Sequence, residues 1–221
     1  MTLNISKGNM YPFITHTWNT VKGKCPHDCF YCYMKRFGEQ KPIRFDDAEL
    51  KTDLGEGNFI FVGSSCDMWA EEIKNKWILD TLIHCNKFKN KYLFQSKNPQ
   101  RFINFISQFP PNIILGTTIE TDAKFGFLGN VPHPNDRALA LSKLSMFFRT
   151  MVTVEPIFVF DPIRLLNLIC MCSPEWVNIG ADSQGHNLPE PSSDKIHALI
   201  DTLRDANIEV KLKSNLKRLM K

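Results

Sequence analysis

The chain has 221 residues, of which 43% are hydrophobic, and its formal net charge is +4 at neutral pH. This length and apolar fraction are typical of one folded domain, here residues 1–221, with a sizeable core. No stretch approaches about 20 uninterrupted apolar residues, and the N-terminal segment lacks the apolar core of a secretory signal. These features argue against a membrane-spanning or exported protein, so we expect a cytoplasmic one.

Short apolar or β-branched runs recur along the chain and predict buried strands. They occupy residues 13–18, 59–62, 92–94, 113–119, 151–154, 176–179 and 208–212. Segments with helical spacing of apolar residues lie between most of them, at 69–82, 102–106, 139–147, 162–171 and 193–205. Asp161 is a plausible N-cap for the fourth helix, because Pro162 follows it at the first helical position.

Alternating strands and helices indicate βα units with a parallel sheet, which is an α/β fold. Six or seven units are too few for a complete eight-unit barrel, which typically needs about 250 residues. The sequence therefore predicts an open, partial parallel barrel of the (β/α)6 type.

Seven cysteines are present, at positions 25, 29, 32, 66, 85, 170 and 172. An odd number in a chain without an export signal argues against a disulfide framework, and clustered cysteines then suggest a metal site. Cys25, Cys29 and Cys32 are separated by three and then two residues, directly after the first predicted strand. Loops at the C-terminal ends of barrel strands are where such folds place their active sites.

Three thiolates on a four-iron, four-sulfur cluster leave one iron without a protein ligand, whereas clusters that only carry electrons normally use four cysteines. A structural zinc site is the alternative, with His27 or Cys66 as the fourth ligand. Zinc ribbons typically show two short-spaced cysteine pairs, and no second suitable pair follows here, because Cys170 and Cys172 fall inside a helical pattern.

The cysteine spacing, with Tyr31 just before the last cysteine, resembles the radical S-adenosylmethionine (SAM) superfamily. The segment 16–21 and the pair Tyr33 and Met34 are similar to a subgroup that contains spore photoproduct lyase and phage-associated proteins of unknown function. The resemblance implies that the open iron chelates SAM. Its one-electron reduction would cleave SAM into methionine and a 5′-deoxyadenosyl radical, which abstracts hydrogen from a substrate.

The same resemblance implies a set of SAM contacts at successive strand ends. Backbone oxygens of the turn Gly63, Ser64 and Ser65 would receive the amino group of SAM, with help from Asp67. The alternative is a tight turn that caps a helix beginning near Met68.

Further contacts are expected on the next strands. Lys97 would pair with the carboxylate of SAM, Thr118 and Glu120 would bind the ribose, and Tyr31 would contact adenine. Two alternatives stay open: Glu120 can instead form an ion pair with Lys97, and an aromatic residue at position 31 can simply shield the cluster.

Polar residues also follow the later strands. Glu155 and Asp182 converge on the same mouth and would contact cofactor or substrate, and Gly180 would let the adenosyl group approach the backbone. Ion pairing with Lys211 or Lys213 is the alternative for the two carboxylates, and an ordinary end-of-strand glycine is the alternative for Gly180.

Cys66 directly follows the glycine turn and is a candidate catalytic residue. Three roles are open. It can be a fourth cluster ligand, a buried packing residue, which is the commonest role of a free cysteine, or a hydrogen donor to a substrate radical, as the resemblance to the lyase implies.

We therefore expect an enzyme with a [4Fe-4S] cluster and SAM as cofactors, and an electron donor of the flavodoxin or ferredoxin type as partner. The substrate is unidentified. Nucleic acid is one candidate, from the resemblance and from the basic segment 211–221, while a peptide or small metabolite is equally open. The alternative function is a non-catalytic module that binds zinc or an iron–sulfur cluster.

Overall fold

The computed structural model describes residues 3–221, so residues 1 and 2 of the N-terminal segment lie outside the described residues. An eight-stranded sheet, in the order β1-β2-β5-β6-β7-β8-β9-β10, forms its centre, and β3 and β4 pair separately. The strands are β1 Asn4–Ile5, β2 His16–Trp18, β3 Val21–Lys22, β4 Arg44–Phe45, β5 Phe59–Val62, β6 Lys91–Ser96, β7 Ile113–Thr118, β8 Arg149–Val154, β9 Trp176–Ile179 and β10 Glu209–Leu212.

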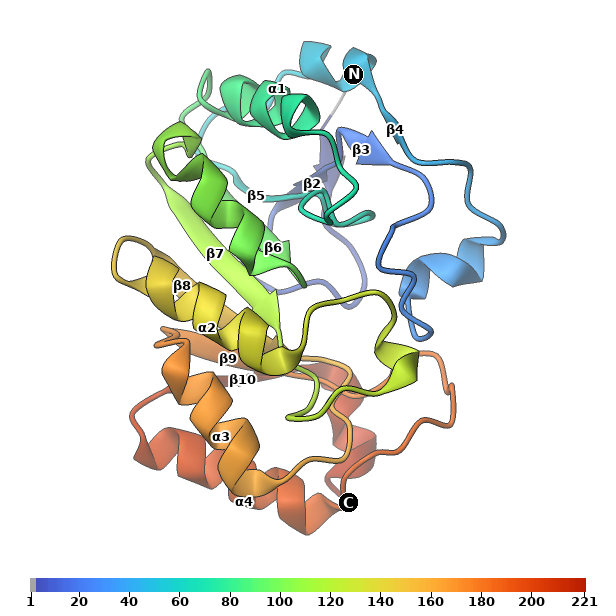
Figure 1. The fold of residues 1–221 in the computed structure, drawn as a ribbon, viewed down its shortest axis with the longest axis vertical. Helices are drawn as coiled ribbons and strands as arrows, with labels where there is room; N and C mark the ends of the chain where they lie inside the picture. The colour runs from blue at the N-terminus through green and yellow to red at the C-terminus, as the bar shows by residue number, and fades with distance from the viewer. Residues whose placement is uncertain (1–2) are drawn as a thin grey trace.

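The sheet is parallel from β2 to β10, and only β1 joins it antiparallel. Its two edges, β1 and β10, do not pair with each other within residues 3–221, so the sheet stays open. The predicted open, partial parallel barrel is confirmed (Figure 1). Because all the parallel strands point the same way, the loops that follow them gather at one edge of the sheet.

Helices cover the outer face of this sheet, as Figure 1 shows for α1 to α4. The α-helices are α1 Asn75–Cys85, α2 Pro134–Ser145, α3 Pro162–Met171 and α4 Ser193–Asp205. The 3-10 segments are η1 Tyr33–Phe37, η2 Asp47–Lys51, η3 Pro99–Gln108, η4 Gly126–Leu128 and η5 Ser214–Leu219. None of the helices in the described part of the chain has the length and apolar character needed to cross a bilayer.

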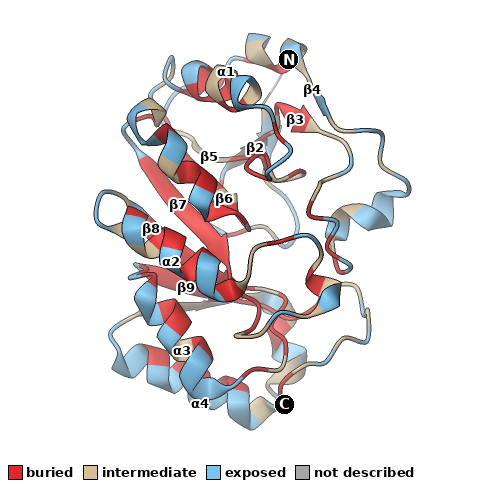
Figure 2. Cartoon of the chain, in the orientation of Figure 1, coloured by how far each residue is buried: buried red, intermediate tan, exposed pale blue. Residues whose placement is uncertain are grey.

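The central strands β6 to β9 are mostly buried on both faces, as the continuous red of β7 in Figure 2 shows, and they are accordingly rich in apolar residues. Alternation along β6 sends Tyr92 and Phe94 outward to the core beneath the helices, and Leu93 inward. The inner cluster is completed by Tyr11 and Ile14 from the N-terminal segment. Side chains of this segment therefore fill part of the interior of the open barrel.

Two of the helix predictions are confirmed in full. Helices α3 and α4 have the predicted bounds, and the Asp161 carboxylate accepts from the Arg164 amide at 2.9 Å. The prediction for 69–82 is wrong over its first part, since residues before Asn75 form turns. The segment 102–106 belongs to a 3-10 element with a kink at Phe105, not to an α-helix. Helix α2 begins at Pro134, earlier than predicted, and ends at Ser145.

We expect Trp69→Ala to lower the free energy of unfolding by about 3–5 kcal/mol, as for other buried aromatic truncations. Trp69 is fully buried, and its ring centroid lies 4.7 Å from that of Phe102 and 5.6 Å from that of Phe109. Urea denaturation measures the change. Phe147→Ala is the control because Phe147 is 69% exposed, and a loss as large in this control would contradict the assignment of the core.

Candidate active site

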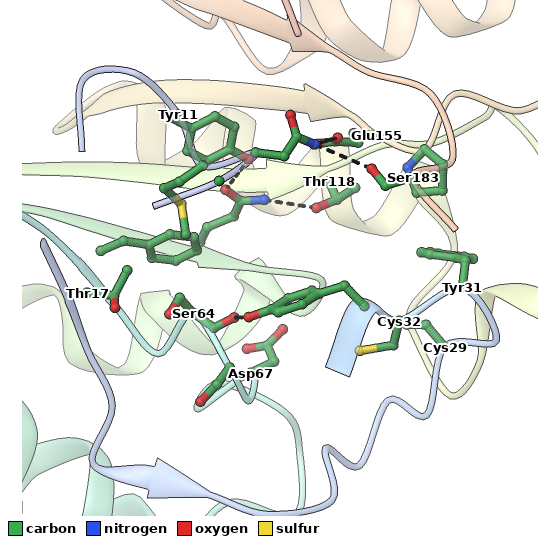
Figure 3. Close-up of a pocket in the computed structure, with 18 of the residues that line it drawn as sticks. Tyr11, Thr17, Cys29, Tyr31, Cys32, Ser64, Asp67, Thr118, Glu155 and Ser183 are labelled. Carbon is green, nitrogen blue, oxygen red and sulfur yellow. Dashed lines mark hydrogen bonds between the residues drawn. The ribbon is translucent and has the colours of Figure 1, made fainter. Parts of the chain in front are cut away.

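A cavity of about 540 Å³ opens where the parallel strands end (Figure 3). Its walls come from the cysteine loop, the ends of β5, β6, β7 and β8, and the N-terminal segment. The sequence-predicted residues that line it are Cys25, Cys29, Tyr31, Cys32, Gly63, Ser64, Ser65, Cys66, Lys97, Thr118, Glu155 and Asp182. Glu120 and Gly180 do not line it. The prediction that strand ends converge on one mouth therefore holds for most of these residues.

Consecutive tight turns bring the three cysteines to one side of their loop. The amide of Asp28 donates to Cys25 O at 3.1 Å, and the amide of Cys32 donates to Cys29 O at 3.2 Å. Asp28 itself adopts a left-handed conformation, with φ of 45°. The loop starts at Gly23, where a side chain would meet backbone atoms at 2.5 Å, so only glycine fits.

His27 fastens this loop to two other parts of the chain. Its Nε2 lies 2.9 Å from Asp67 Oδ2, and its Nδ1 lies 2.9 Å from the carbonyl oxygen of Asn130. Both partners are acceptors, so both ring nitrogens donate and the ring is an imidazolium. Burial lowers the pKa of His27, but the charge of Asp67 outweighs burial and raises it to about 9.

Asp67 receives hydrogen bonds from three directions besides His27. The amide of Trp69 donates to Oδ1 at 3.0 Å, while the Ser96 hydroxyl and the Lys97 amide both donate to Oδ2 at 2.9 Å. Burial raises the pKa of Asp67, but His27 and these donors leave it lowered overall. Asp67 thus ties the ends of β5 and β6 to the cysteine loop, and these donors take up the oxygens that were expected to help with the amino group of SAM.

The loop 125–131 packs against the other side of the cysteine loop. The amide of Asn130 donates to His27 O at 2.7 Å, and that of Phe30 donates to Phe127 O at 3.1 Å. Gly129 has φ of +86°, and a Cβ there would lie 2.0 Å from His27 O. Sequence reasoning missed this contact, because nothing in the segment 125–131 indicates a partner about a hundred residues away.

Lys97 and Glu120 form the ion pair that the sequence left open as an alternative. Glu120 is fully buried, and its other oxygen accepts from Arg137 Nη1 at 2.7 Å. Burial raises the pKa of Glu120, but the charges of Arg137 and Lys97 outweigh it and lower the pKa overall. Tyr31 closes the group, since Lys97 Nζ donates to its hydroxyl oxygen at 2.7 Å and that hydroxyl bonds to Glu120.

The opposite wall holds a second charged group around Glu155. Its oxygens accept from Lys213 Nζ at 2.7 Å, from Asn215 Nδ2 at 2.9 Å and from Asn9 Nδ2 at 3.0 Å. The Glu155 carboxyl lies 2.7 Å from where a Cβ at Gly180 would be, so glycine is needed there for the approach of Glu155, and the predicted approach of the adenosyl group stays a prediction.

Asp182 is engaged by its own loop. It accepts from the amides of Gln184 and His186 at 3.0 and 2.6 Å, and from the His186 ring at 2.9 Å. Burial raises the pKa of Asp182, but these donors outweigh it and lower the pKa overall. The side chain lines the cavity while its oxygens stabilise the turn after β9.

The N-terminal segment supplies residues that the sequence did not single out. Tyr11 donates to Gln95 Oε1 at 2.9 Å, lies 2.7 Å from Thr153 Oγ1, and points toward Glu155 and Thr118 in Figure 3. Gln95 in turn donates to Thr118 at 3.1 Å. No periodicity in this segment predicts that it reaches the mouth, so only the tertiary fold reveals these contacts.

Cys66 lies at the cavity wall and is only 2% exposed. The thiols of Cys66 and Cys25 interact, which lowers the pKa of Cys25 and raises the pKa of Cys66. The remaining cysteines do not line the cavity: Cys85 and Cys172 are buried elsewhere and Cys170 is exposed. The position at the mouth is as predicted, and the role of Cys66 stays open.

The donor set fits an iron–sulfur cluster in its chemistry, since three thiolates share one loop and one cavity. In the part of the chain from residue 3 onward, no three His, Cys, Asp or Glu side chains converge closely enough to hold a single metal ion. A tetrahedral zinc site requires four ligands within about 2.0–2.3 Å of one ion. A four-iron cluster is a larger group, and its cysteines are correspondingly farther apart.

Solved structures of known proteins have a fold similar to that of this chain. A cysteine-to-serine mutant of spore photoproduct lyase superposes with a TM-score of 0.67 over 95% of this chain and 79% of that one, at 9% identity. A tyrosine-to-phenylalanine mutant gives 0.65 over 96% and 80%, at 8% identity. The chain has the fold of spore photoproduct lyase. The fold implied by the cysteine motif is thus confirmed.

The likeness also has limits. A double mutant of spore photoproduct lyase with bound AdoMet and dinucleoside spore photoproduct matches with a TM-score of 0.58, at 11% identity. The match covers 88% of this chain but only 62% of that one, so the chain spans less than two thirds of its length. No family model and no curated protein matches the sequence.

We expect Asp67→Asn to lower the free energy of unfolding by about 3–5 kcal/mol, because it leaves the buried imidazolium of His27 without its counter-charge. Chemical denaturation of the metal-free protein measures this loss. The matched control is Asp80→Asn, which breaks an exposed pair with Lys76 at 2.7 Å and should cost less than about 1 kcal/mol. Equal losses in the two variants would show that Asp67 does not fasten the loop.

Proposed function

We propose that the protein is a radical SAM enzyme. One observation carries the proposal: the three cysteines of the motif share one loop and line the cavity at the strand ends of the lyase fold. Cys25, Cys29 and Cys32 would hold a [4Fe-4S] cluster, which when bound supplies an iron that chelates SAM and the electron that cleaves it. We also propose that the protein is cytoplasmic, because the cluster requires reduced cysteines and the cytoplasm keeps thiols reduced.

The chain's own residues would then bind and orient SAM. Lys97 has three N–H donors, of which Glu120 and Tyr31 take two, so the third is available to the carboxylate of SAM. The backbone oxygens of the turn 63–65 are proposed for its amino group. In this structure Ser64 O accepts from the Tyr33 hydroxyl at 2.9 Å, so the amino group of SAM would share this oxygen with the hydroxyl or displace it.

The volume of the cavity supports a second ligand beside SAM. At about 540 Å³ it lies within the range of roughly 300–1,000 Å³ that small-molecule sites occupy. The wall formed by Tyr11, Gln95 and Thr118 offers uncharged hydrogen-bonding groups away from the cysteines. We propose this wall as the substrate side, and nucleic acid as one candidate substrate, supported by the dinucleoside bound in spore photoproduct lyase.

We expect anaerobic reconstitution to load about four irons per chain and the brown colour to bleach with dithionite. In the presence of SAM, the reduced protein should release 5′-deoxyadenosine. Cys29→Ala should lose both iron and 5′-deoxyadenosine formation, whereas Cys170→Ala, which changes an exposed cysteine on α3, should keep both. Stoichiometric zinc without iron would instead support the alternative, a non-catalytic metal-binding module.

We expect Cys66→Ala to keep its iron and to keep cleaving SAM, because three thiolates suffice for the cluster. A role as hydrogen donor would show as 5′-deoxyadenosine formation with a lost or diverted product, and a packing role as a loss of stability only. Iron analysis, 5′-deoxyadenosine assay and thermal unfolding separate these. Loss of iron in Cys66→Ala, with iron retained in Cys32→Ala, would overturn the assignment of the three cluster cysteines.

A further inference from the structure

We propose that the exposed side chains of residues 24–44, here called the basic flank, dock an acidic protein that carries one electron to the cysteine loop. The proposal rests on the function proposed above, since only a redox cluster needs such a partner. It assigns to the partner a defined surface beside the cysteines that centres on Lys24, Lys35, Lys41 and Arg44, whereas Tyr33 and Arg36 of the same segment line the large cavity.

The first observation is the distribution of charge. Residues 24–44 contain five of the chain's 27 basic side chains and only two of its 23 acidic side chains. This segment therefore contributes most of the formal net charge of +4. Lys41 and Arg44 are exposed and form no ion pair with any acid among residues 3–221. Asp28 is shared between Lys24 and Lys35, at 3.8 and 3.0 Å, which leaves that trio positive.

A second cavity, of about 250 Å³, reaches the cysteines from this flank. Its walls include Lys24, Met34 and Lys35 from the flank, together with all three motif cysteines. The cysteines also line the large cavity, so they form the partition between the two. A redox group held by them would therefore be accessible from the flank without passing through the substrate side.

The flank also has the composition of a protein interface. Phe37 and Phe30 are 62% and 52% exposed, and the Arg36 guanidinium lies 4.7 Å from the centre of the Phe37 ring. Aromatic residues and arginine are enriched in protein interfaces, and a charged rim speeds association with an oppositely charged partner. Figure 2 shows that η1, which carries Arg36 and Phe37, projects from the molecule and is largely exposed.

These observations favour an electron carrier over a nucleic acid. A nucleic-acid substrate has to reach the large cavity, and four of the five basic residues of the flank, Lys24, Lys35, Lys41 and Arg44, do not line that cavity. A carrier only has to approach the cysteines closely, because electron transfer slows steeply with distance. The second cavity provides that approach, and its basic surroundings complement an acidic partner.

The test uses the cluster-loaded protein and flavodoxin as the acidic carrier. The flank variant is Lys41→Glu/Arg44→Glu, which changes exposed side chains that line neither cavity. The matched control is Lys143→Glu/Lys195→Glu, which changes exposed lysines on α2 and α4. Both variants lower the formal net charge by the same amount, so only the position of the charge differs.

We expect the flank variant to reduce the rate constant for cluster reduction by reduced flavodoxin about tenfold at low ionic strength, within the range that electrostatic steering covers. Its affinity for oxidised flavodoxin, measured by titration, should fall in parallel, and both effects should shrink at high salt. Reduction by dithionite, a small reductant, should be unchanged. The control variant should behave as the wild type with both reductants.

Three results would overturn the proposal. Equal effects of the two variants would mean that net charge, and not the flank, governs association. Unchanged flavodoxin kinetics, or a flank variant that loses affinity for a single-stranded DNA oligonucleotide but not for flavodoxin, would remove the assigned partner. A protein that takes up no iron would overturn the proposed function itself, whereas dithionite bleaching without any flank effect refutes the docking surface alone.

Discussion

The buried carboxylate of Asp67 is the constraint on which the arrangement of the site depends. An ionised carboxylate in an apolar interior is costly unless charge and hydrogen bonds compensate it fully. Here the compensation comes from the His27 ring and from groups at positions 69, 96 and 97. Moving the cysteine loop away would leave this charge without its imidazolium, so the loop and the ends of β5 and β6 hold one another in place.

Two charged groups, one around Glu120 and one around Glu155, lie on opposite sides of the cavity and differ in how deeply they are buried. Glu120 is fully enclosed by Lys97, Tyr31 and Arg137, so it fixes the direction of the lysine more than it contacts a ligand. Glu155, by contrast, lies at the cavity surface, where the side-chain amides of Asn9 and Asn215 and the ammonium group of Lys213 donate to it. The buried group around Glu120 carries a net positive charge, whereas Glu155 lines the cavity together with its donors Asn9 and Lys213, where a ligand can compete for their hydrogen bonds.

The sequence predicted the parallel strands because each contains a short run of apolar or β-branched residues, and it predicted the start of α3 because Asp161 caps it locally. It failed before α1 because Trp69 and Ile73 have helical spacing, yet Arg101 donates to the carbonyl oxygens of residues 70, 71 and 73 and stabilises a turn. The site residues that follow these strands could be identified because the ends of the strands were predicted. Asn9 and the loop 125–131 were not, because their contacts join segments far apart in the sequence.

The motif cysteines separate two sides of the site, and these sides lie on different segments of the chain. The groups of the proposed substrate side lie on strand ends and the N-terminal segment, whereas the basic flank lies on the segment between β3 and β4 and on the first residue of β4. If the flank docks a partner as proposed, most changes in it would alter that contact without moving an end of a strand of the eight-stranded sheet. Yet both sides meet at Cys25, whose neighbours are Cys66 on the β5 side and His27 on the loop. The Asp67 and His27 pair is thus the element through which a distortion of the flank would reach the cavity.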